Sequence, residues 1–258
     1  MTEINNIDST YFNYFNPLIN KFVNNYNLYA PKIDGVPGLS LPLFRKGYGS
    51  SHLRLVFVGI DDANTFLDLK GYFCDPDPLR TALTQFQNKF KLNQKSIFWK
   101  FIIKLLSSLH NLNKDWSEMT DEEKFYIFSD FAWSNVFPIA FYKNRAKRLN
   151  ILKNYWDSVS KAGEELFFGF KHILNTLNPN VAVIMYKNCS ILNYIERDYP
   201  GDLKKVDECV KEGKFLTHYL LERQEGNVNI FHVPHPRYMR RLKDLKGEEF
   251  FCNKLTEL

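Results

Sequence analysis

Short continuous runs of apolar residues along the chain predict buried β-strands. Four of them, four to six residues long and rich in β-branched or aromatic side chains, fit strands of a central sheet. They cover Leu55–Val58, Trp133–Phe137, Val181–Tyr186 and Val228–Val233. The segment Phe215–Leu221 has the pattern of a further strand, which we expect at the edge of the sheet.

Between these runs the apolar residues recur three or four positions apart, which is the spacing of an amphipathic helix. Thr120 and Glu123 have the spacing of a capping box and predict the start of one such helix. The other predicted helices are Ser9–Tyr29, Pro78–Phe90, Ser96–His110, Leu149–Leu177 and Asn188–Glu196.

This alternation of strands and helices is typical of the α/β class. It predicts a three-layer α/β/α sandwich around a central, mainly parallel four-stranded sheet. A length of 258 residues suits a single domain. We expect that domain to carry an N-terminal helical extension, about residues 1–48, and a helical insertion, about residues 78–130.

Composition narrows the class of protein. Apolar residues make up 45% of the chain, which is enough for a substantial core, and the formal charge of +5 is a mild bias toward a polyanionic partner. No apolar run has the length of a membrane span, and the N-terminus lacks the pattern of a signal peptide. We therefore expect a cytoplasmic monomer that does not bind membranes.

The four cysteines are scattered along the chain without a Cys-x-x-Cys pair. Metal and iron–sulfur sites usually need such a pair, because one short loop must direct two ligands to one ion. The sequence therefore predicts reduced, isolated thiols and neither a metal site nor a cofactor.

Polar residues stand at the ends of three of the predicted strands. Asp61 and Asp62 follow the first strand, Asn135 lies within the second, and His235 follows the fourth, between Pro234 and Pro236. In parallel sheets, ligands bind at the carboxyl ends of the strands. The two acids could instead cap a helix, the asparagine could satisfy a neighbouring backbone, and the histidine could be structural.

The order of these residues resembles the uracil-DNA glycosylase superfamily, from about Leu53 to Arg241. Where the best-known branch has Gly-Gln-Asp-Pro-Tyr-His, this chain has Gly-Ile-Asp-Asp-Ala-Asn over residues 59–64. Where that branch has His-Pro-Ser-Pro-Leu, this chain has His-Pro-Arg-Tyr-Met over residues 235–239. The branch of the superfamily with an iron–sulfur cluster has four clustered cysteines, which this chain lacks.

The resemblance implies a role for each matching residue. Asp61 corresponds to the catalytic carboxylate, which orients a water and stabilises positive charge on the deoxyribose. His235 corresponds to the histidine that stabilises the departing base, and Asn135 to the residue that binds the polar edge of a flipped base. Phe73 is the candidate stacking partner of that base, and Met239 matches the apolar wedge that fills the gap in the duplex.

Basic residues near these motifs are expected to contact DNA phosphates. One group follows the last motif and consists of Arg237, Arg240, Arg241 and Lys243. A second group follows the second strand and consists of Lys143, Arg145, Lys147 and Arg148. The second group could equally form a solvated loop.

Three residues depart from the family pattern. Asp62 replaces a proline, Ala63 replaces a tyrosine that blocks C5 of the base, and Arg237 replaces a serine. Without the tyrosine, the pocket could admit a pyrimidine with a substituent at C5, and Asp62 could accept a hydrogen bond from it. Phe66 or Tyr72 could instead fill the space and keep the pocket selective for uracil.

The resemblance implies a DNA glycosylase that flips out a pyrimidine and hydrolyses its N-glycosidic bond, leaving an abasic site. Its substrate would be uracil or a C5-modified pyrimidine such as a modified phage cytosine, in DNA repair or anti-phage defence. One alternative is a catalytically idle member of the fold that binds DNA or a protein. Another is an unrelated α/β hydrolase or nucleotide-binding enzyme in which Asp61 and Asp62 bind Mg²⁺, although no Gly-rich phosphate loop is present.

Overall fold

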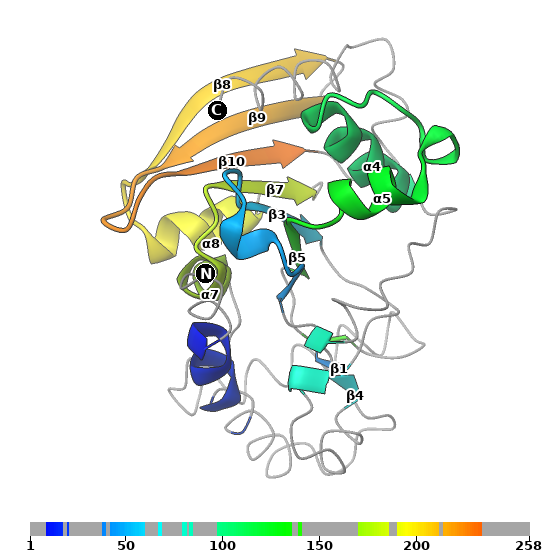
Figure 1. Ribbon diagram of the computed structural model, residues 1–258. Coiled ribbons are helices and arrows are strands. Elements are labelled where there is room, and N and C mark those ends of the chain that lie inside the picture. Colours follow the sequence, from blue (N-terminus) through cyan, green and yellow to red (C-terminus); the bar gives the residue numbers. More distant parts are fainter. Residues whose placement is uncertain are drawn as a thin grey trace.

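The structure is a computed structural model of the chain, shown in Figure 1. It describes residues 9–17, 20, 38–39, 42–59, 67–68, 79–81, 83–84, 97–135, 139–140, 170–185, 190–211 and 214–233. All structural statements below concern these residues.

The main feature is a seven-stranded sheet of order β2-β5-β3-β7-β10-β9-β8. The four strands predicted for its centre are parallel neighbours, since β3 pairs with β5 and β7, and β7 pairs with β10. The remaining three strands are antiparallel to their neighbours. The strand bounds are β2 Leu43–Phe44, β3 Leu55–Gly59, β5 Phe131–Asn135, β7 Val181–Met185, β8 Leu203–Lys211, β9 Lys214–Leu221 and β10 Val228–Val233.

The prediction of a four-stranded, mainly parallel sheet is therefore wrong in strand number, and three of the six pairings are antiparallel. Strand β9, predicted at the edge, lies between β10 and β8. β8 gives no apolar signal because it is an outer strand rich in charge, with Lys204, Lys205, Asp207 and Glu208 in succession around Val206. β2 has only two residues, too few to show a period.

A second, smaller sheet has three two-residue strands in the order β4-β1-β6, all antiparallel. Its strands are β1 Gly38–Leu39, β4 Leu67–Asp68 and β6 Ile139–Ala140. The pattern of the sequence does not predict this sheet, again because each strand is so short.

The helices cover both faces of the seven-stranded sheet (Figure 1). The predicted segments 96–110 and 188–196 correspond to α4 and α8, and only the last part of 149–177, helix α7, lies among the described residues. None of the described helices is long and apolar enough to span a membrane. The helices are residues 9–17, residues 79–84 in part, α4 Ile97–Leu109, α5 Asp121–Ile127, α7 Phe170–Leu177 and α8 Ser190–Asp198, with 3-10 turns η1 Tyr48–Ser50 and η2 Trp116–Glu118.

Alternating strand residues form two separate cores, one on each face of the sheet. On one face, Val56, Val58 and Ile184 pack with the helix of residues 9–17, α7 and α8. On the other face, Phe57 and Val183 pack with α4 and α5. Because both faces of the central strands are buried, their sequences are continuously apolar. The arrangement is a three-layer α/β/α sandwich, as the sequence predicts.

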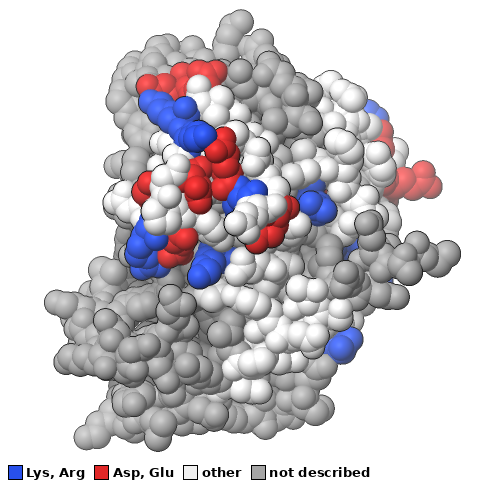
Figure 2. All heavy atoms as spheres, turned by 90° about the vertical axis from the view of Figure 1, so that its left-hand side faces the viewer, with Lys and Arg blue, Asp and Glu red and all other residues white. Residues whose placement is uncertain are grey.

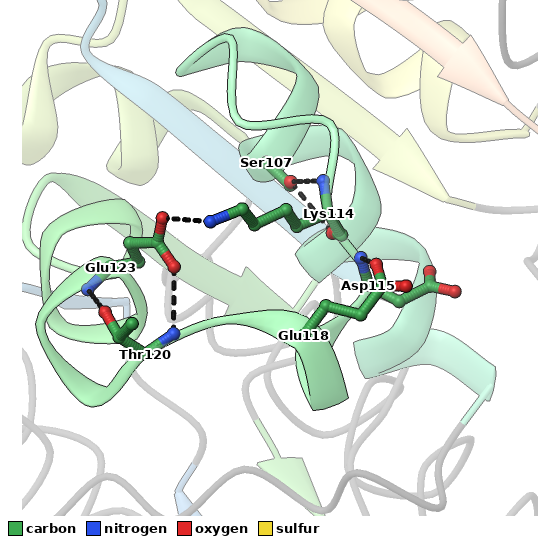
Figure 3. Close-up of polar contacts among 6 residues, drawn as sticks. All are labelled: Ser107, Lys114, Asp115, Glu118, Thr120 and Glu123. Carbon is green, nitrogen blue, oxygen red and sulfur yellow. Dashed lines mark hydrogen bonds and ion pairs between the residues drawn. The ribbon is translucent and has the colours of Figure 1, made fainter.

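The connection between α4 and β5 is fixed by a polar network (Figure 3). The Thr120 backbone N–H donates to a Glu123 carboxylate oxygen at 2.8 Å, and the Glu123 N–H donates to the Thr120 hydroxyl at 3.2 Å, which is the predicted capping box. The Lys114 ammonium donates to the other Glu123 oxygen at 2.5 Å. The hydrogen bond from Lys114 is the largest cause that lowers the pKa of the Glu123 carboxyl.

Replacing Glu123 with Gln should therefore reduce stability in a pH-dependent way. A carboxyl with a lowered pKa in the folded state stabilises the protein above its unfolded pKa of about 4.3, and this contribution is lost as the pH falls through the folded value. Urea unfolding should show that Glu123→Gln is less stable than the natural protein at neutral pH, and that this difference shrinks as the pH is lowered below about 4.3. Glu122→Gln removes an exposed charge of the same helical turn and serves as the control. A Glu123→Gln deficit that did not change with pH would contradict this assignment.

Candidate functional site

The strand order places a topological switch point at the carboxyl edge of the sheet. The chain passes from β3 to β5 on one side of β3, and then to β7 and β10 on its other side. The switch point is therefore between β3 and β7. In doubly wound α/β sheets, ligands bind in the crevice outside the carboxyl ends of the strands at this point.

Strand register brings the carboxyl ends of the four parallel strands level with one another. Gly59, the last residue of β3, is the partner of Asn135, the last residue of β5. Met185, the last residue of β7, is the partner of Val233, the last residue of β10. Neighbouring strands lie about 4.8 Å apart, so β3 and β10, with β7 between them, are separated by about 10 Å.

Among the predicted site residues, the structure describes only Asn135, and of it only the backbone, beside Gly59. Asp61 comes two residues after Gly59, and His235 two residues after Val233. The ends of β3 and β10, which these two positions follow in the sequence, lie roughly 10 Å apart. The predicted residues that lie outside the described part of the chain are Asp61, Asp62, Ala63, Phe66, Tyr72, Phe73, Lys143, Arg145, Lys147, Arg148, His235, Arg237, Met239, Arg240, Arg241 and Lys243.

The small sheet lies close to this edge and anchors the two segments that leave it. Residues 60–66 connect β3 to β4, and residues 136–138 connect β5 to β6. Leu67 and Ile139, where these segments end, are both partners of Leu39 in β1. Because Asn135 and Ile139 can be at most about 14 Å apart, the small sheet must stand next to the carboxyl edge. Gly59 and Asn135 thus lie side by side at the carboxyl edge, and Leu67 and Ile139 lie on either side of one strand of the small sheet.

A row of buried residues lies one position below the strand ends. Ser134, Val58, Ile184 and His232 are successive register partners across β5, β3, β7 and β10. Ser134 and His232 are 2% and 1% exposed. Neither residue is among the predicted site residues, although each is a polar residue within an apolar run, as Asn135 is. Buried polar groups need hydrogen-bond partners, so these two residues restrict how the layer beneath the site can pack.

The alternative hypothesis, in which Asp61 and Asp62 bind Mg²⁺, predicts a metal centre. Among the described residues, no group of three His, Cys, Asp or Glu side chains could hold a metal ion. Asp61 and Asp62, the acids proposed as Mg²⁺ ligands in that reading, lie outside those residues.

The opposite, amino edge of the sheet carries a pocket of about 590 Å³. It contains none of the predicted site residues. Figure 2 shows the face of the molecule on this side, where acidic and basic side chains are interspersed over the described part. An interspersed surface of this kind is a poor binding site for a duplex, which requires a continuous basic patch. We therefore place the candidate catalytic site at the carboxyl edge.

Comparison with known proteins adds no relative to this picture. No protein-family model matches the chain, and no curated protein matches it.

Proposed function

We propose that the protein is a DNA glycosylase whose site lies at the carboxyl edge of β3, β5, β7 and β10. One observation carries the proposal. The three strands that bear or precede Asp61, Asn135 and His235 belong to one group of four parallel neighbours, and the switch point of that group is at β3, the strand that precedes Asp61 in the sequence. A sheet that separated these strands would have left the motif residues unable to meet.

In the proposed reaction, the Asp61 carboxylate orients a water molecule toward C1′ of the deoxyribose and stabilises the positive charge that develops on the sugar. The bond between C1′ and the base nitrogen breaks, and its electron pair leaves with the base. His235 stabilises the resulting anion by a hydrogen bond. The water oxygen bonds to C1′ and its proton passes to the carboxylate, so the products are a free base and an abasic site.

A base within a duplex is out of reach of such a site, so it must be flipped out of the stack. Asn135 is the proposed reader of the flipped base, because its amide offers both a donor and an acceptor. Phe73 would stack on the base, and Met239 would fill the space left in the duplex. The group Arg237, Arg240 and Arg241, together with Lys143 and Arg145, would contact phosphates.

The proposed substrate is uracil or a pyrimidine with a substituent at C5. Ala63 occupies the position of the tyrosine that blocks C5 in the uracil-specific branch, and Asp62 adds an acceptor next to it. A hydroxymethyl group, or a sugar attached to it, would fit these two changes. Removal of modified bases from phage DNA is the proposed cellular setting, with DNA repair as the second one.

The second candidate function is a DNA- or protein-binding module that has lost activity. It is favoured by the loss of the proline and the tyrosine from the first motif, at Asp62 and Ala63. The two functions differ in one product, because only the enzyme leaves abasic sites that alkali can cleave.

Replacing Asp61 with Asn should abolish most activity and leave DNA binding in place. The amide keeps the shape of the carboxylate and removes its charge, and loss of a positioned catalytic group commonly costs about a hundredfold or more in rate. Single-turnover base release from a panel of modified oligonucleotides, followed by alkaline cleavage, measures the rate, and a gel shift measures binding. An unchanged release rate in Asp61→Asn would rule out its role. Release of none of the bases by the natural protein would favour the inactive binding module.

Replacing Ala63 with Tyr should exclude C5-modified bases and spare uracil. A phenol ring and a bulky C5 substituent cannot occupy one volume, and packed sites relieve such overlap poorly. Excision of uracil, 5-hydroxymethylcytosine and its glucosylated form should be compared in the two proteins. Activity confined to uracil in both would reject the enlarged pocket while leaving the glycosylase assignment standing.

A further inference from the structure

The pocket at the amino edge of the sheet lies at the opposite end of the parallel strands from the proposed catalytic site. It is bounded by the residue that precedes β3, by the end of α7 and by the turn between β9 and β10. Its volume of about 590 Å³ is within the range of small-molecule sites, roughly 300–1,000 Å³. The residues that line it include Arg54, Leu174, Leu177, Asn178, Arg223 and Glu225.

Two partly buried guanidinium groups line this pocket, and one of them, that of Arg223, also forms a side-chain hydrogen bond with Tyr199. Arg54 immediately precedes β3, and its Nε is buried without a hydrogen-bond partner. Arg223 follows β9 and donates from Nη2 to the Asn178 side-chain oxygen at 2.9 Å, while its Nε is also buried without a partner. Within the described part of the chain, neither guanidinium forms an ion pair with a carboxylate.

Unsatisfied polar atoms are concentrated at this edge of the molecule. Across the described residues, seven buried side-chain nitrogen or oxygen atoms lack a hydrogen-bond partner. Four of them belong to Tyr48, Arg54, Asn180 and Arg223, which line the pocket or stand within two residues of its lining. Buried polar groups in folded proteins are normally satisfied by protein, water or ligand. Two of the four are the Nε atoms of Arg54 and Arg223, whose guanidinium groups belong to the lining of one pocket.

The pocket also has acceptors and an apolar part. The carboxyl end of α7, at Leu177, presents backbone carbonyls and the negative end of the helix dipole, and Glu225 adds a carboxylate. Leu174 and Leu177 supply the apolar wall. A simple anion would meet only part of this lining, whereas a ligand with an oxyanion, an apolar or planar body and hydrogen-bond donors would complement all of it.

We propose that this pocket binds a nucleoside monophosphate. Its phosphate would lie against the Arg54 and Arg223 guanidinium groups, which bind such oxyanions through paired N–H donors. The sugar and base would lie against Leu174 and Leu177, and an exocyclic amino group would donate to Glu225 or to the end of α7. The proposal stands apart from the glycosylase assignment, because none of its residues belongs to the proposed catalytic site.

Isothermal titration of the full chain at low salt, with deoxycytidine monophosphate, deoxycytidine and inorganic phosphate, tests the proposal. The nucleotide should bind the natural protein with a Kd of about 1 mM or tighter, phosphate more weakly, and the nucleoside not measurably. Arg54→Gln and Arg223→Gln should each weaken nucleotide binding about tenfold or more. Arg54→Lys should weaken it less than Arg54→Gln, because it keeps the charge and loses the planar fork.

Lys205→Gln is the matched control, because it removes one positive charge from exposed β8, away from the pocket lining, and should change the Kd by less than about twofold. Circular dichroism checks that each variant is folded. Absence of nucleotide binding at about 10 mM would overturn the proposal and assign the unmet donors to water. If Lys205→Gln weakened nucleotide binding as much as the arginine variants do, the role of the arginines would be overturned. The same would follow if the natural protein bound the nucleoside as tightly as the nucleotide. Phosphate binding as tight as the nucleotide would overturn the assignment to a nucleotide.

Discussion

Parallel pairing of β3 with both β5 and β7 is the constraint on which the rest of the structure depends. It makes β3 an inner strand of the parallel group, and it aligns Gly59 with Asn135 at one end of the sheet. It also requires the chain to cross from one side of β3 to the other between β5 and β7, which produces the switch point. Without these two pairings, the residues after the strands would have no common edge at which to assemble.

The pairing is held by burial on both faces of β3. Val56 and Phe57 are fully buried on opposite sides, against different sets of helices. A slip of one residue in register would exchange the two faces and move Gly59 away from Asn135. Because large side chains pack against each face, such a slip would require both cores to repack at the same time. The packing of the strands therefore protects the alignment of their ends.

The sequence predicts the central strands well because burial on both faces makes each of them a continuous apolar run. It predicts α4 and the start of α5 from spacing and from the Thr120 capping box. It misses β8, because an outer strand needs no apolar residues to form and Lys204 to Glu208 look like a solvated loop. The sequence does not predict the small sheet, because strands of two residues are too short to show an alternation of apolar and polar side chains.

At the candidate site, sequence alone selects Asn135 and the positions that follow β3 and β10, since polar residues at the ends of apolar runs are conspicuous. It does not select Ser134 and His232, because their significance is a matter of register across four strands. Nor does it select Arg54 and Arg223, which are 169 residues apart and meet at one pocket only through the order of the strands. Ordinary surface arginines have the same local pattern in sequence.

The outer strand β8 determines how other molecules can approach the sheet. Its ladder with β9 shifts register between Lys205 and Asp207, leaving Val206 as an extra residue, and charged side chains stand on both sides of that bulge. Bulges and charges of this kind make an outer strand a poor partner for a further strand from another chain. Addition of a strand from another molecule is therefore disfavoured along β8.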